Sequence, residues 1–262
     1  VKFAGFYWRI IRINSNGSIR MIYDGTSVHA NGESSTDRQY ETSVFNPNYN
    51  NNMYVGYMYT EGEAHGTGTS STIKTNADKF YTDKLSSYAS KLETDAGFCG
   101  DRSNLNGQSG VGTGTVITYN KGYLRVVESA PTLACENASD YYTVASASSG
   151  NKKLSYPIGL IAADEAMLAG HAGGVFDGSY NHMKTNNGSY LVTGNTFWTM
   201  TPAGSYNTFG YANWSARVLY VDDSGGIDDG MIGINGLRPV INIRSDAKIT
   251  GSGTQNNPYL VN

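Results

Sequence analysis

The stretch from Ser205 to Asn235 holds the densest set of side chains able to contact a ligand, because aromatic residues there alternate with small polar and acidic ones. Tyr and Trp rings provide large contact areas at low entropic cost, and Ser, Gly and Asn adapt their hydrogen bonds, as in binding loops. The alternative is a turn-rich edge of a β protein with half-buried aromatics, and composition favours neither. The candidates are Tyr206, Asn207, Phe209, Tyr211, Asn213, Trp214, Ser215, Arg217, Tyr220, Asp222, Asp223, Ser224, Asp228 and Asp229.

Four aspartates in this stretch, Asp222, Asp223, Asp228 and Asp229, surround a Ser-Gly-Gly turn. Calcium prefers several carboxylate oxygens, although the spacing is not that of an EF-hand and such loops are often solvated turns. We therefore expect no cofactor, with calcium at these aspartates as the metal alternative.

The motif search does not favour enzyme chemistry. The histidines His29, His65, His171 and His182 form no H-E-x-x-H pair, and no G-x-S-x-G elbow or P-loop occurs. His171 and His182 could converge after folding, and carboxylates brought together by folding would permit glycosidase chemistry. The motifs predict a protein without catalytic residues.

The two cysteines, Cys99 and Cys135, are too few for a zinc ribbon and lie in no C-x-x-C motif. Either they form one disulfide or they are two unrelated buried thiols. The disulfide is favoured because the rest of the composition is typical of extracellular proteins.

Composition narrows the function class. The 262 residues include 32 Gly and 20 Tyr, and only 16% are charged, against about 25% in an average protein. The net charge of −3 does not suit a nucleic-acid binder, which needs cations to neutralise phosphates. No apolar run is long enough to span a bilayer. Because the sequence begins at Val1 without a signal peptide, we expect an anchor upstream, no membrane contact from this fragment, and display outside the cell or on its surface.

The elements that must position these residues are strands near both ends and two helices. Alternating residues on either side of Asn14-Ser15-Asn16-Gly17 predict a hairpin over 6–24. A helix is predicted over 76–95, capped by Asn76, and a short one over 163–169. Further strands are predicted at 53–59, 123–127, 156–161, 195–201, 217–222 and 237–243. The pattern indicates an α+β fold with one main sheet, as a single domain over 1–262 with insertions at about 26–75 and 98–153.

Several segments together resemble a known family. They are Trp8–Ile13, Ile19–Thr26, Tyr156–Ile161, Phe197–Pro202 (F-W-T-M-T-P) and Gly236–Ile243 (G-L-R-P-V-I-N-I). The chain resembles bacterial surface proteins with a C-type-lectin-like domain, related in fold to formylglycine-generating enzymes. Some members are variable proteins of diversity-generating retroelements, including forms fused to a pilin-like helix.

The resemblance implies a central antiparallel sheet with two helices, in which the hairpin at 6–24 lies near 237–243. It implies a hypervariable ligand-binding segment at about 205–235, just before the final core strand. Adenine-directed mutagenesis of Asn codons yields residue types found at most of the candidate positions, and at Gly233 and Asn235. The implied function is a surface-displayed adhesin or receptor-binding protein. Its ligand would be a protein or glycan on another cell or phage.

Two other functions stay open at this stage. One is a carbohydrate-active or formylglycine-generating type of enzyme, although Cys99 and Cys135 lie far upstream of the C-terminal core. The other is a structural pilin or tail subunit whose aromatic face is buried against another copy.

Overall fold

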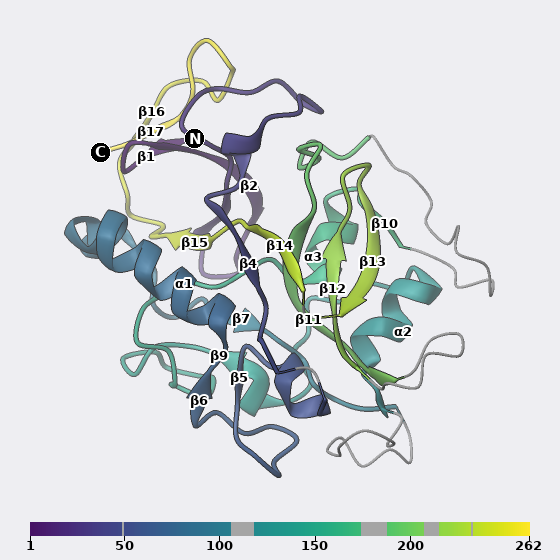
Figure 1. Cartoon of the computed structure of the whole chain (residues 1–262). Coiled ribbons are helices and arrows are strands. Elements are labelled where there is room, and N and C mark those ends of the chain that lie inside the picture. The colour runs from purple at the N-terminus through teal and green to yellow at the C-terminus, as the bar shows by residue number, and fades with distance from the viewer. Residues whose placement is uncertain (49, 106–117, 174–187, 207–214, 232) are drawn as a thin grey trace.

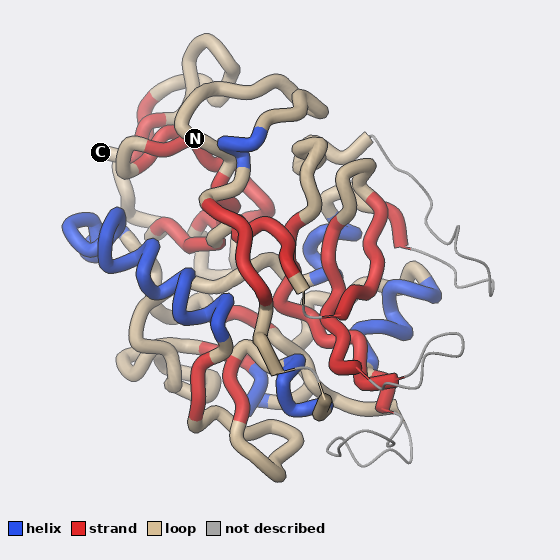
Figure 2. The backbone as a smooth tube through the Cα atoms, in the orientation of Figure 1, coloured by secondary structure: helices blue, strands red, loops and turns tan. Residues whose placement is uncertain are grey.

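Two large β-sheets organise the chain, with short helices packed around them (Figures 1 and 2). This computed structural model describes residues 1–48, 50–105, 118–173, 188–206, 215–231 and 233–262. Strands far outnumber helices within that part, so the α+β class is confirmed. None of the described helices is long and apolar enough to cross a membrane.

The first sheet joins the two ends of the sequence, and its strand order is β15-β3-β2-β1-β17-β16. The predicted hairpin is confirmed, since β2 and β3 pair antiparallel around the turn at Gly17, whose φ is +79°. On its other side β3 pairs with β15, with Ile22 opposite Val240, so the hairpin lies beside the final core strand as expected. The strands are β1 (Lys2–Phe3), β2 (Phe6–Ile13), β3 (Ile19–Tyr23), β15 (Val240–Ile243), β16 (Ile249–Thr250) and β17 (Leu260–Val261).

The second sheet carries most of the candidate ligand residues that the structure describes, in the order β10-β13-β12-β11-β14-β4, and β8 pairs with the far end of β11. Its strands are β10 (Ala172–Gly173), β13 (Gly226–Met231), β12 (Ser215–Val221), β11 (Phe197–Tyr206), β14 (Ile234–Leu237), β4 (Glu41–Val44) and β8 (Thr118–Tyr119). The predicted strand at 237–243 is therefore divided at Arg238-Pro239 between the two sheets.

The helices are α1 (Thr72–Phe80), α2 (Lys121–Glu128) and α3 (Ala163–Leu168). The short helix at 163–169 is confirmed. The long one begins earlier than predicted, because the Ser71 hydroxyl accepts from the Lys74 amide at 3.3 Å. Asn76 instead lies inside the helix and donates to the Ser43 hydroxyl. A π-helical turn (Tyr81–Leu85) and a 3₁₀ helix (Ser86–Lys91) continue it.

Three predicted strands are wrong in whole or in part. Residues 123–127 belong to α2, where Val126 is buried and Arg125 pairs with Asp164 at 2.7 Å. Residues 156–161 form a single bridge, between Gly159 and Val240. Residues 53–59 divide into a 3₁₀ helix (Asn52–Val55) and strand β5 (Met58–Tyr59). Short apolar runs do not distinguish a strand from a buried helix, and here tertiary contacts decide.

The remaining elements are β6 (Thr69–Ser70), β7 (Phe98–Cys99), β9 (Tyr141–Tyr142) and the 3₁₀ turns Thr36–Arg38 and Ala138–Asp140. Strands β5 and β6 form one small antiparallel pair, and β7 and β9 form another. Cys99 and Cys135 form a disulfide, as predicted, which ties β7 to the segment that follows α2.

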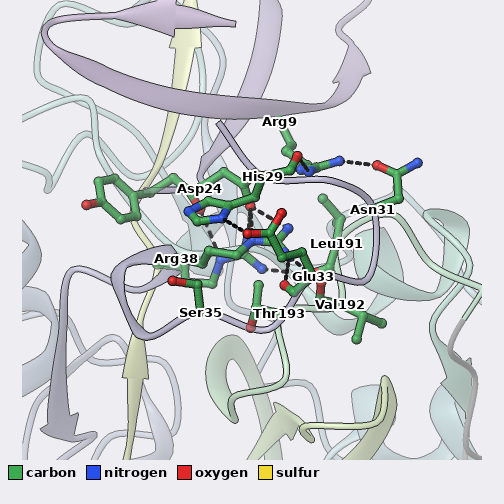
Figure 3. A network of polar contacts seen from close by, with 12 residues as sticks. Arg9, Asp24, His29, Asn31, Glu33, Ser35, Arg38, Leu191, Val192 and Thr193 are labelled. Atoms are coloured by element: carbon green, nitrogen blue, oxygen red, sulfur yellow. Dashed lines mark hydrogen bonds and ion pairs between the residues drawn. The ribbon is translucent and has the colours of Figure 1, made fainter. Parts of the chain in front are cut away.

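A buried ionic cluster fixes the place where the chain passes from one sheet to the other (Figure 3). The Asp24 carboxylate accepts from Arg38 at 2.7 Å and from Arg238 at 3.0 Å, and both guanidinium groups are buried. Arg38 and Arg238 also donate to the carbonyls of Val192 and Leu191. Arg238, in the G-L-R-P-V-I-N-I segment, is thus an internal anchor of the fold.

Candidate ligand-binding site

The β12–β13 hairpin supplies most of the described part of the predicted ligand segment. The two strands pair without a bulge from Arg217 opposite Met231 to Val221 opposite Ile227. Tyr206 is the last residue of β11 and pairs with Ser215. The predicted residues Asn207, Phe209, Tyr211, Asn213 and Trp214 lie outside the described residues.

Asp222 organises the turn of this hairpin. Its Oδ1 accepts from the amides of Ser224 and Gly226 and from the Ser224 hydroxyl, each at 2.8 Å. From the opposite side, the ring Nδ1 of the buried His171 donates to the Gly225 carbonyl at 3.0 Å. Burial lowers the pKa of His171 to about 4. The polar side chains of the turn therefore hydrogen-bond its backbone.

The hairpin presents its charged residues on two opposite faces, because neighbouring residues in a regular strand point to opposite sides. Arg217 and Asp229 share one face and form an ion pair at 2.8 Å. Tyr220 and Asp228 lie on the other face, where the Tyr220 hydroxyl donates to the Asp228 carboxylate at 3.1 Å. The predicted ligand-binding residues therefore lie on both faces of the sheet and do not form one continuous surface.

A row of residues crosses three strands on the Arg217 face. The register places Tyr119 of β8 and Arg217 of β12 on either side of Gly204 in β11. Gly204 has φ +144°, and a Cβ at that position would collide with the Thr118 carbonyl oxygen. Glycine therefore permits close pairing of β8 and leaves no side chain between the tyrosine and the arginine.

Helix α2 adds Tyr123 to this row, since its ring stacks on Tyr119 at a centroid distance of 5.7 Å. Burial, and next the nearby Asp229 carboxylate, raise the pKa of Tyr123 to about 12. Its phenol stays protonated at neutral pH. We call Tyr119, Tyr123, Arg217 and Asp229 the tyrosine–arginine cluster. It offers two rings and a partly buried ion pair whose side chains are 14% and 13% exposed.

The opposite face is more apolar. Tyr220 packs edge-on against the buried Trp198 at 6.1 Å, and Gly230 leaves room for both rings. Burial, followed by Asp228, raises the pKa of Tyr220, and burial also raises the pKa of Asp228. This face therefore combines a protonated phenol with a carboxylate that is costly to ionise.

Strand β14 completes the segment. Gly233 is exposed, Asn235 is half-buried, and Ile234 between them is 70% exposed. Ser215, in contrast, is buried, so its side chain is not part of a surface. Sequence reasoning missed Tyr119, Tyr123 and Ile234. The helix that contains Tyr123 was predicted as a strand, and Tyr119 lies outside that helix on β8, so no local pattern joined the two tyrosines.

The calcium alternative is wrong for the four aspartates. Asp222 caps the turn, Asp223 is exposed, and Asp228 and Asp229 point to opposite faces. Among the residues placed by the structure, no group of three or more His, Cys, Asp or Glu side chains could hold a metal ion.

The other histidines lie away from this hairpin. His29 and His65 each contact carboxylates, His29 those of Glu33 and Asp37 and His65 that of Asp140. His182 lies outside the described ranges, and so does the alternative in which it converges with His171.

Comparisons with known proteins identify no relative of this chain. No protein-family model, no curated protein and no solved structure matches the chain.

Proposed function

We propose that the chain is a non-enzymatic, surface-displayed ligand-binding protein of the adhesin or receptor-binding type. The tyrosine–arginine cluster is the observation that carries this proposal. It gathers stacked rings and a partly buried ion pair from three strands and a helix, the combination that concentrates binding energy at protein interfaces. The ligand would be a protein or glycan on another cell or phage.

The fold supports the same proposal. We propose a C-type-lectin-like domain, because the hairpin near one end pairs with the core strand near the other, and a mostly antiparallel sheet carries the segment just before that strand. In such a domain the segment at 205–235 would be diversified by a retroelement. Positions such as Arg217 and Asp229 contact each other, so they can change together with little effect on the core.

Extracellular or cell-surface display is part of the proposal. The Cys99–Cys135 disulfide supports it, because disulfides persist in oxidising compartments and are rare in the cytosol.

The test is binding of the fluorescently labelled chain to a panel of intact bacteria and phage particles. We expect at least one particle to be labelled, and the Tyr119→Ala/Arg217→Ala variant to lose the labelling while keeping its thermal melt. Ile13→Ala, an exposed substitution on the first sheet, is the matched control. Retained labelling by the double variant would refute the site.

Diversification is tested separately in the neighbouring DNA. We expect a reverse transcriptase gene and a near-identical repeat of the codons for residues 205–235, with mismatches confined to template adenines. Absence of a repeat would contradict the retroelement link and leave the binding test unaffected.

A further inference from the structure

A polar cavity lies at the first sheet, away from the β12–β13 hairpin. Its volume is about 530 Å³, within the range of about 300–1,000 Å³ for small-molecule sites. It is lined by strand β2, Val1, Asp24, residues 28–31, Tyr190 and the loop of the β16–β17 hairpin at 253–259. Parts of the chain that are far apart in sequence thus converge there.

The charged side chains that line this cavity are already paired inside the protein. Arg9 donates from Nε to Asp24 at 2.6 Å, from one terminal nitrogen to the Asn31 side chain, and from the other to the His29 carbonyl at 2.7 Å. The His29 ring lies between the carboxylates of Glu33 and Asp37, at 2.9 and 2.8 Å. The Val1 ammonium, which also lines the cavity, donates to the Trp8 carbonyl at 2.8 Å. No lining arginine or histidine side chain of the described chain is therefore left to recognise a phosphate or carboxylate.

These contacts also hold the cavity wall in place (Figure 3). Arg9, Asn31 and His29 tie residues 29–31 to β2 and to the buried Asp24 cluster. The Tyr190 hydroxyl donates to the Ile10 carbonyl at 2.9 Å, which fixes its ring. The wall is therefore formed before any ligand arrives, which reduces the entropic cost of binding.

The groups that face a ligand are tyrosine rings, the Gln255 amide and the Thr254 hydroxyl, which also accepts from the Asn257 amide at 3.1 Å. The rings of Tyr7, Tyr190 and Tyr259 line the cavity, and Tyr259 is 36% exposed. Gln255 and Thr254 reach it from the hairpin loop, and the Gln255 side chain makes no hydrogen bond within the described part of the chain. Aromatic faces take up apolar C–H surfaces, and an amide both donates and accepts.

We propose that this cavity binds a neutral saccharide of one or two rings. Such a ligand combines C–H faces, which suit tyrosine rings, with hydroxyl groups, which suit amides, and it carries no charge to be compensated. The site is independent of the tyrosine–arginine cluster, so the chain would hold two ligands at once, and failure of one proposal leaves the other standing.

The experiment is saturation-transfer NMR and calorimetry on the intact chain. The probes are lactose, maltose, cellobiose and N,N′-diacetylchitobiose, with 3′-sialyllactose and glucose 6-phosphate as charged counterparts. We expect at least one neutral disaccharide to bind with a Kd on the order of 1 mM, and the charged probes to bind more weakly.

Two variants locate the binding. Gln255→Ala removes an exposed amide without a structural role, and Tyr259→Ala removes a ring that packs on Gly253. Each should weaken binding about tenfold, while Arg217→Ala, on the other sheet, should leave it unchanged. If no neutral probe binds, if the charged probes bind at least as well, or if both variants retain the affinity of the original chain, the proposal is overturned.

Discussion

The two surfaces proposed to bind ligands are built in different ways. In the tyrosine–arginine cluster, side chains project from paired strands and neutralise one another, as Arg217 and Asp229 do at 2.8 Å. At the cavity of the first sheet, Arg9 donates to Asp24, whose carboxylate also accepts from the buried Arg38 and Arg238. Backbone hydrogen bonds between strands position the tyrosine–arginine cluster, whereas the buried Asp24 carboxylate holds the residues of the cavity in place.

This difference has a consequence for how each surface tolerates change. Backbone hydrogen bonds hold paired strands together, and a cross-strand pair of side chains adds only about 0.2–1 kcal/mol, so residues of the cluster can be exchanged at small cost. The three arginines around Asp24 lose their common partner if that one carboxylate is removed. We therefore expect variation to be tolerated on the second sheet and to be costly beneath the cavity.

The largest expected effect is at Asp24. Asp24→Asn leaves Arg38 and Arg238 buried without a counter-charge, which should lower the free energy of unfolding by about 3–5 kcal/mol. Urea unfolding followed by circular dichroism measures this. Asp246→Asn removes an exposed partner of Arg244 and serves as the control, with little change expected. An equal loss of unfolding free energy in Asp24→Asn and Asp246→Asn would show that the buried carboxylate supports the fold no more than an exposed one does.

The next effect concerns the turn of the β12–β13 hairpin. The pKa of His171 is about 4 in the folded chain, below its ordinary value of about 6.5, so the unfolded chain binds more protons between these values. The contribution of neutral His171 to the free energy of unfolding is therefore fully present above pH 6.5. It should fall by up to about 3 kcal/mol as the pH drops to 4.

The matched variant is His171→Asn, whose amide can still donate to the Gly225 carbonyl. Urea midpoints of both proteins between pH 7 and pH 4 isolate the histidine, because other acid-sensitive groups are shared. The variant should lack this part of the decline. Parallel curves would show that His171 is not kept neutral by burial.

Strands at both ends of the sequence were predictable because alternation and turn residues act locally. The hairpin around Gly17 and the strand at 217–222 needed nothing else. The helix at 123–127 was not predictable in this way, because it depends on the ion pair of Arg125 with Asp164 and on the packing of Val126 against the sheet. These contacts join residues far apart in sequence, and a run of five residues does not encode them.

The candidate site was only partly predictable, because local sequence patterns do not show which residues distant in sequence meet in the fold. Arg217, Tyr220, Asp228 and Asp229 were identified from composition, but the division of the hairpin into two faces required the strand register. Tyr119 joins the cluster because β8 pairs with β11 at Gly204, a pairing between residues that no local pattern relates. Similarly, nothing in the G-L-R-P-V-I-N-I segment indicated that Arg238 would be buried.

A smaller effect is expected from the ion pair of the cluster. In a double-mutant cycle with Arg217→Ala and Asp229→Ala, we expect a coupling of about 1 kcal/mol, because the pair is only partly buried. Chemical unfolding of the four proteins gives this value. A coupling comparable with the loss at Asp24 would mean that this surface, too, is part of the internal framework and cannot vary freely.

The smallest effect on stability is expected at Ile234, which is 70% exposed on β14. Ile234→Ala should change the free energy of unfolding by no more than about 0.5 kcal/mol, yet weaken the labelling of any cell or phage that the chain binds. Leu237, three residues later on the same strand, is 0% exposed, and Leu237→Ala should cost about 2–5 kcal/mol. Because both changes remove apolar groups from one strand, they separate loss of ligand contact from loss of core packing. If Ile234→Ala keeps full labelling, β14 supports the binding face without contributing to it.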